Sequence, residues 1–129
     1  MRGAGENLST STRILLVEDH DATRNSLSRL LKARGYEVAA AGSVETARSL
    51  ALQGAFAILI SDLGLPDGDG HTLFPEMRKR FPRLKGIALT GYGAEEDVAR
   101  TKAHGFGQHL TKPIEIRDLE KALEWVLKG

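Results

Sequence analysis

The chain has 129 residues, with 18 Lys or Arg against 17 Asp or Glu, so its formal net charge is +1. This balance gives no indication of nucleic acid or an anionic membrane as a partner. The length suits one domain, and the absence of cysteine excludes cysteine nucleophiles and thiolate metal sites. No apolar stretch reaches the roughly 20 residues of a membrane span, and the start of the chain lacks the apolar core of a signal peptide. We therefore expect a cytoplasmic protein.

The composition changes near residue 13. Residues 1–12 are small and polar and have no apolar periodicity, which predicts a disordered tail or a linker remnant. Residues 13–129 are expected to form a single domain, since nothing is left over for a second one.

From Arg13 onward, short apolar runs alternate with segments of helical periodicity. The runs that indicate strands are 14–17, 37–41, 57–61, 86–90 and 106–110. The first helix is expected to end at Gly35, the second to run from a cap at Ser43 to Gly54, and the third to stop before Pro82. The fourth helix is expected over 94–104 and the fifth from Ile116. This alternation predicts an α/β fold, a parallel sheet with helices on both faces.

Polar side chains follow four of these runs. They are Glu18 and Asp19 after the first, Asp62 after the third, Thr90 at the end of the fourth and Lys112 after the fifth. Because ligands bind beyond the carboxyl ends of the strands in open α/β sheets, we expect these groups to meet in one crevice.

The chemistry of these groups is consistent with phosphoryl transfer. Close carboxylates repel one another unless a cation lies among them, and Mg²⁺ takes one or two carboxylates while keeping waters. Lys112 and Thr90, with backbone N–H groups of Gly91-Tyr92-Gly93, can bind phosphoryl oxygens. An Asp carboxylate can serve as the nucleophile and form an acyl phosphate.

Four motifs in order resemble the receiver domain of bacterial two-component response regulators, and the receiver of a hybrid sensor histidine kinase is one form that the chain could represent. They are Val17-Glu18-Asp19, the stretch from Asp62 through Leu63-Gly64-Leu65-Pro66 to Gly68, then Leu89-Thr90-Gly91, and Thr111-Lys112-Pro113. The resemblance covers residues 13–128. It implies a flavodoxin-like (βα)5 three-layer fold with strand order 2-1-3-4-5.

The resemblance also implies a metal site and a phosphoacceptor. Asp62 is then the phosphoacceptor and a Mg²⁺ ligand. Asp19 binds the metal directly, Glu18 binds it through water, and the backbone carbonyl of Gly64 completes the protein ligands. Mn²⁺ is expected to substitute for Mg²⁺.

The remaining motif residues are implied to bind or sense the phosphoryl group. Thr90 is the switch hydroxyl, with Gly91 beside it, and Lys112 pairs with a phosphoryl oxygen. The bond before Pro113 is expected to be cis. His109 departs from the family pattern, because a Tyr or Phe usually stands there as the switch ring, but His109 could still act as that ring. His20, His71 and His104 are expected at the surface, since none has metal-ligand spacing with another histidine.

By resemblance, the domain accepts a phosphoryl group from a phosphohistidine of a sensor histidine kinase or a histidine phosphotransfer domain. It catalyses its own phosphorylation and dephosphorylation rather than turning over a substrate. Water access to the acyl phosphate is expected to depend on Gly64 and Tyr92. Output is expected through the fourth helix, fifth strand and fifth helix, with the chain monomeric or in a weak phosphorylation-dependent dimer.

Three other interpretations stay open. Asp19-His20-Asp21-Ala22-Thr23 resembles the first motif of haloacid-dehalogenase-type phosphatases, with Asp19 as nucleophile and Asp21 as acid/base. The chain could also be a degenerate receiver that acts only as an interaction module. Glu18 and Asp19 could form a cap for the first helix, an interpretation compatible with a metal site.

Overall fold

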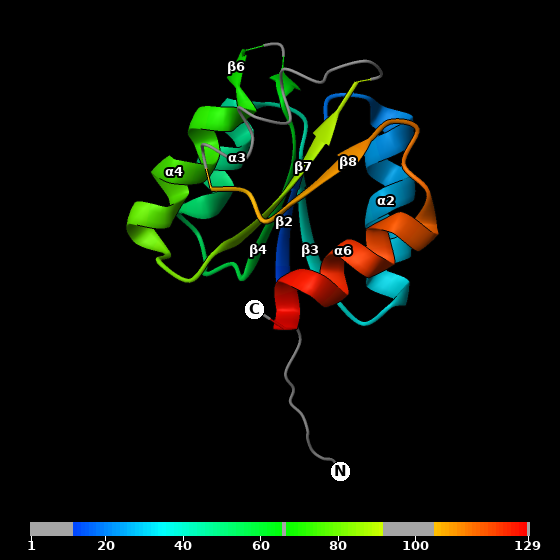
Figure 1. Ribbon diagram of the computed structural model, residues 1–129. Helices are drawn as coiled ribbons and strands as arrows, with labels where there is room; N and C mark the ends of the chain where they lie inside the picture. Colours follow the sequence, from blue (N-terminus) through cyan, green and yellow to red (C-terminus); the bar gives the residue numbers. More distant parts are fainter. Residues whose placement is uncertain (1–11, 66, 92–104, 129) are drawn as a thin grey trace.

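The computed structural model describes residues 12–65, 67–91 and 105–128. These residues form a parallel sheet with helices packed on both of its faces (Figure 1). The helix expected over 94–104, residue Tyr92 and residues 1–11 of the expected tail lie outside the described residues.

The main sheet has five parallel strands in the order β3-β2-β4-β7-β8. In chain order this is 2-1-3-4-5, so the expected fold class and strand order are confirmed. The strands are β2 (Arg13–Val17), β3 (Glu37–Ala41), β4 (Ile58–Asp62), β7 (Lys85–Thr90) and β8 (Gln108–Thr111).

Four strand predictions were wrong at their ends, β2 and β7 by beginning one residue earlier than expected, at Arg13 and Lys85. β4 begins and ends one residue later than expected, so Asp62 is the last residue of the strand and pairs with Leu89. β8 begins at Gln108, two residues later than expected. Phe106 is apolar because its ring packs on Phe74, with ring centroids 4.5 Å apart, and not because it belongs to the strand.

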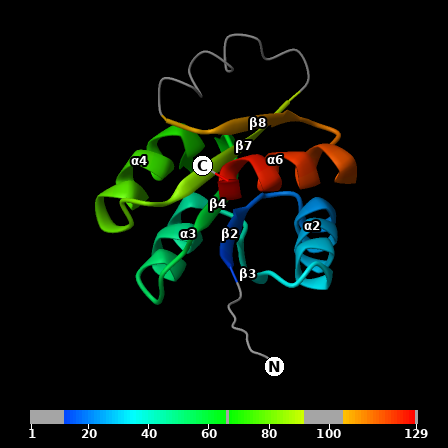
Figure 2. The ribbon, with the colours of Figure 1, turned by 60° about the horizontal axis from the view of Figure 1, so that its bottom comes forward.

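The helices in the described part of the chain cover both faces of the sheet (Figure 2). They are α2 (Asp21–Ala33), α3 (Val44–Ala51), α4 (Gly70–Arg80) and α6 (Ile116–Lys128). Side chains along β2 alternate between the two layers. Leu15 and Val17 pack in the cluster under α3 and α4, while Ile14 and Leu16 pack in the cluster under α2 and α6. None of these helices is long and apolar enough to span a membrane.

Local sequence signals explain how α2 ends and how α3 begins. Gly35 follows the end of α2 with φ +93°, a conformation that favours glycine and stops the helix. At the start of α3, the Ser43 side chain accepts a hydrogen bond from the N–H of Thr46. Both features agree with the sequence prediction.

A two-stranded antiparallel ribbon follows Asp62 and was not predicted. It consists of β5 (Gly64–Leu65) and β6 (Gly68–Asp69), with Asp67 in the turn between them. The Asp67 carboxylate accepts hydrogen bonds from the N–H groups of Val44 and Glu45, at 2.8 and 3.0 Å. The ribbon is thereby joined to the first turn of α3.

Candidate functional site

The polar residues predicted at the strand ends meet at one edge of the sheet. In the ladders Val17 pairs with Ser61, Asp62 with Leu89 and Thr90 with Thr111, so the strands end at a similar level. The N–H of Lys112 donates to the carbonyl of Thr90 at 2.8 Å, which extends this edge past β8.

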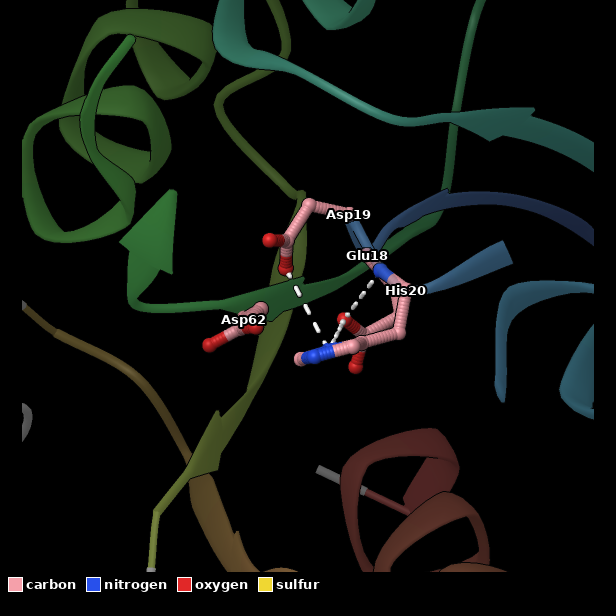
Figure 3. Close-up of side chains that lie close together, drawn as sticks. All are labelled: Glu18, Asp19, His20 and Asp62. Carbon is pink, nitrogen blue, oxygen red and sulfur yellow. Dashed lines mark hydrogen bonds and ion pairs between the residues drawn. The ribbon is translucent and has the colours of Figure 1, made fainter. Parts of the chain in front are cut away.

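Three carboxylates lie close together at this edge, as Figure 3 shows for Glu18, Asp19 and Asp62. One potential ligand atom from each of them, with one from His20, falls within 4.8 Å of the others. The Glu18 side chain is fully buried, that of Asp62 is 9% exposed and that of Asp19 is 31% exposed. Such burial costs free energy unless the charges are compensated.

Lys112 supplies part of that compensation. Its Nζ lies 2.8 Å from Asp62 Oδ2 and 2.6 Å from Glu18 Oε1. The contact with Asp62 is a hydrogen bond, whereas Glu18 Oε1 makes an ion pair without hydrogen-bond geometry. One ammonium group therefore bridges two carboxylates from different strand ends.

The pKa values in this group follow from burial and from competition for Lys112. Burial raises the pKa of Glu18, but Lys112 and the His20 N–H outweigh burial and lower it to about 2. Burial also raises the pKa of Asp62, and repulsion by Glu18 adds to the rise, which Lys112 and the Gly64 N–H only partly offset. Burial alone would lower the pKa of Lys112, but Asp62 and Glu18 raise it. Lys112 is therefore held as a cation.

The donor atoms fit a hard divalent cation. Asp19 Oδ1 is buried and has no hydrogen-bond partner among the described residues, and its separation from His20 Nδ1 is 3.7 Å. An unpaired carboxylate oxygen beside two further carboxylates is the kind of ligand set that Mg²⁺ prefers. The positive charge of a bound Mg²⁺ would add to that of Lys112 in neutralising the three carboxylates.

Gly64 lies beside Asp62 and leaves open space there. Its N–H donates to Asp62 Oδ1 at 3.1 Å. Among the described residues, nothing lies within 4 Å of where a Cβ at this position would be. The described part of the chain therefore leaves space on this side of Asp62.

Thr90 is 2% exposed, and its hydroxyl is bound to β8. Thr90 Oγ1 lies 2.7 Å from His109 Nε2 and donates to the Leu110 carbonyl at 3.4 Å. Gly91, the next residue, is exposed, and a Cβ there would meet nothing within 4 Å. Tyr92 lies outside the described residues.

The Lys112–Pro113 peptide bond is cis, as the resemblance implies. Beside it lies a cavity of about 330 Å³ between α2 and the segment that follows β8. Its lining includes Lys112, Pro113, Thr23 and Leu27. Lys112 therefore forms part of a concave surface next to the site.

His20 belongs to the site more closely than the sequence indicated. Its side chain is 72% exposed, which fits a surface residue, but its Nδ1 lies 3.3 Å from Glu18 Oε2 and its N–H donates to the same oxygen at 3.0 Å (Figure 3). Because His20 directly follows Asp19 in the sequence, its position could have indicated that it lies at the site. His20 is also the N-cap of α2 and makes no side-chain cap bond, while its own N–H is bound by the Glu18 carboxylate.

The phosphatase interpretation receives no support from Asp21. Its side chain is 83% exposed and pairs with Arg24, which also donates to the Glu18 carbonyl at 2.9 Å. The expected acid/base is thus held in an ion pair on α2.

Comparisons with known proteins agree with one another. A family model described as the response regulator receiver domain matches residues 14–124. The response regulator protein FleR of Pseudomonas aeruginosa is 38% identical over 84% of this chain, and the sensor kinase CckA of Brucella abortus is 36% identical over 95% of it. The chain spans only 23% of FleR and 13% of CckA.

Solved structures show the same similarity. A CheY-like response regulator receiver domain protein from Methanospirillum hungatei superposes with a TM-score of 0.84 at 31% identity, covering 92% of this chain and 96% of the other. The chemotaxis response regulator CheY4 of Vibrio cholerae gives a TM-score of 0.83 at 28% identity, covering 91% and 99%.

Proposed function

This chain belongs to the response regulator receiver domain family, a family of phosphoacceptor signalling domains, and from that premise we propose that Asp62 is its phosphoacceptor. One observation carries the assignment: Asp62 ends the central strand β4, and its carboxylate is held by Lys112 and by the Gly64 N–H. Asp19 and Glu18 lie close enough to Asp62 to share a cation with it.

In the proposed reaction, an Asp62 oxygen attacks the phosphorus of a phosphohistidine. The new O–P bond forms as the N–P bond breaks, and the imidazole leaves with the electron pair and takes up a proton. Asp19, Asp62 and the Gly64 carbonyl would hold Mg²⁺ directly and Glu18 would hold it through water, and the ion would neutralise charge on the transferring oxygens.

Lys112 and Thr90 would bind the phosphoryl group once it is on Asp62. Lys112, which bridges Asp62 and Glu18 in this structure, would exchange its contact with Asp62 for one with a phosphoryl oxygen. Thr90 would donate a hydrogen bond to a second oxygen, and the Gly91 N–H would assist. Water attack on the acyl phosphate would later restore Asp62, with its access set by Gly64 and Tyr92.

We infer that the phosphodonor is a sensor histidine kinase or a histidine phosphotransfer domain. The cavity beside Lys112 and Pro113 supports approach of such a donor from the α2 side. A receiver within a hybrid kinase is one context consistent with the similarity to CckA. Output through β8 and α6 fits the contact between Thr90 and His109.

Phosphorylation by a small-molecule donor tests the assignment directly. We expect incubation with acetyl phosphate and Mg²⁺ to add one phosphoryl group, and mapping of the trapped acyl phosphate to place it on Asp62. The Asp62→Asn variant should take up none. Label on Asp19 that survives this substitution would contradict the assignment and favour the phosphatase interpretation. An unlabelled wild-type protein that also fails to respond to beryllofluoride would indicate an interaction module.

A further inference from the structure

The contact between Thr90 and His109 joins two residues on neighbouring strands. Ala88 pairs with His109 and Thr90 pairs with Thr111 in the β7–β8 ladder. Side chains on one face recur every second residue, so His109 lies on the same face as Thr90 and diagonal to it. The residue directly opposite is Ala88, whose small side chain leaves room for the imidazole to reach Thr90 Oγ1.

Within the described residues, the Thr90 hydroxyl makes two hydrogen bonds, and both are to residues of β8. A hydroxyl has one proton and can also accept, so it can accept from His109 while it donates to the Leu110 carbonyl, or donate to His109 itself. With either tautomer of the ring, the hydroxyl stays bound to β8. In the part of the chain that the structure describes, no side-chain hydrogen bond joins the Thr90 hydroxyl to Asp62 or Lys112, although the Lys112 N–H donates to the Thr90 carbonyl.

We propose that His109 is a positioning residue that holds the Thr90 hydroxyl on β8 until a phosphoryl group at Asp62 displaces it. This proposal rests on the function proposed for Asp62. The hydrogen bond between Thr90 and His109 adds an energetic cost to switching, because it must break. Thr90 can turn toward a phosphoryl oxygen only by giving up its 2.7 Å contact with Nε2. The strength of this hydrogen bond therefore sets how readily the domain switches.

A phenylalanine ring at this position would lack the contact. It has no nitrogen to bind Thr90 Oγ1, so of the two bonds to described residues the hydroxyl would keep the 3.4 Å bond to the Leu110 carbonyl. The histidine thus adds a directional bond to the hydroxyl that a phenylalanine ring could not make. Loss of this contact would also change the environment of a side chain of β8, the strand whose contacts extend to α6.

Beryllofluoride, a stand-in for the phosphoryl group, tests the proposal by titration calorimetry at saturating Mg²⁺. We expect His109→Phe to bind it about three- to tenfold more tightly than wild type, because one hydrogen bond is no longer lost on binding. His109→Gln, whose amide can still bond to the hydroxyl, should lie closer to wild type. In a Thr90→Val background, His109→Phe should have no effect.

The outcomes separate this proposal from the proposed function. If wild type binds beryllofluoride but His109→Phe binds it equally or more weakly, only the role of His109 is overturned. If His109→Phe also tightens beryllofluoride binding in a Thr90→Val background, the role of His109 is likewise overturned. If wild type does not bind, the proposed function fails, and the hydrogen bond is then tested by imidazole ¹⁵N chemical shifts. Thr90→Val should move the His109 Nε2 signal, and an unmoved signal would overturn the contact. Thermal melts check that each variant folds.

Discussion

At the scale of single residues, the site depends on one ammonium group shared by two buried carboxylates. Lys112 lies within 2.8 Å of both Asp62 Oδ2 and Glu18 Oε1. Removing one partner of a buried ion pair leaves an uncompensated charge and typically costs about 3–5 kcal/mol. The same ammonium repels any cation that enters the carboxylate cluster.

The Lys112→Met substitution should therefore lower the stability of the metal-free protein but raise its affinity for Mg²⁺. We expect a lower melting temperature without metal, because Glu18 and Asp62 then repel one another without a cation between them. We also expect Mg²⁺ to bind several-fold more tightly in titration calorimetry. Lys121→Met, on the exposed surface of α6, serves as the control. Weaker Mg²⁺ binding in Lys112→Met would contradict this account.

Gly64 offers a second test at this scale. In the part of the chain that the structure describes, nothing lies within 4 Å of where its Cβ would be, so a larger side chain has space beside Asp62 there. We expect Gly64→Arg to slow loss of the acyl phosphate several-fold by excluding water, with a smaller effect for Gly64→Ala. The measurement is the decay of labelled protein after the donor is removed. Equal decay in wild type and Gly64→Arg would exclude a role for this space.

At the scale of elements, the start of α3 is completed by a residue 23 positions away along the chain. Asp67 binds the N–H groups of Val44 and Glu45, while Ser43 binds that of Thr46. Three of the four N–H groups that a helix leaves unpaired at its start are thereby satisfied. The β5–β6 ribbon beside Asp62 is consequently fixed to α3.

The cap predicts a pH dependence of stability. The N–H groups of Val44 and Glu45 lower the pKa of Asp67 below its ordinary value of 3.8. A lowered pKa in the folded state means that the stabilisation is complete above the unfolded value and is lost as the pH falls through the folded value. Asp67→Ala should melt a few degrees below wild type at pH 7, and the difference should shrink below about pH 3.8.

Asp67→Asn provides the matched control for this prediction. Its amide oxygen can still accept from one N–H group, so part of the stabilisation should remain without the titration. A difference between wild type and Asp67→Ala that stays constant down to pH 2 would contradict an ionised cap.

At the scale of the whole molecule, the strand order brings distant residues to one edge. β2 lies between β3 and β4, so Glu18 and Asp19 come next to Asp62, while β7 and β8 bring Thr90 and Lys112 to the same side. The site therefore draws on most of the sheet. A ligand that binds there binds only the folded state and should stabilise the whole domain.

Thermal unfolding in the presence of metal tests this coupling. At a Mg²⁺ concentration one hundred times the Kd, mass action adds about 2.7 kcal/mol to the free energy of unfolding. For a domain of this size that corresponds to a rise in Tm of about 5–15 °C. Asp19→Asn should reduce the rise, and a chelator should reverse it. An equal rise in Asp19→Asn would show that the metal binds elsewhere.

The sequence by itself determined the α/β class, the strand order through its family resemblance, and the residues that gather at the strand ends. It could do so because burial on both faces leaves a continuous apolar run and because polar groups at strand ends are costly unless they are used. Element ends were less accurate where a residue is apolar for another reason, as with Phe106, whose ring packs on Phe74.

Only the tertiary structure decided how those residues pair. That Lys112 bridges Glu18 and Asp62, that Asp67 caps α3, that His20 contacts Glu18 and that His109 binds Thr90 all depend on side chains from separate segments. The physical reason is that hydrogen bonds and ion pairs act over about 3 Å. Apolar periodicity, by contrast, is written along the chain and specifies which faces are buried but not which polar atoms meet.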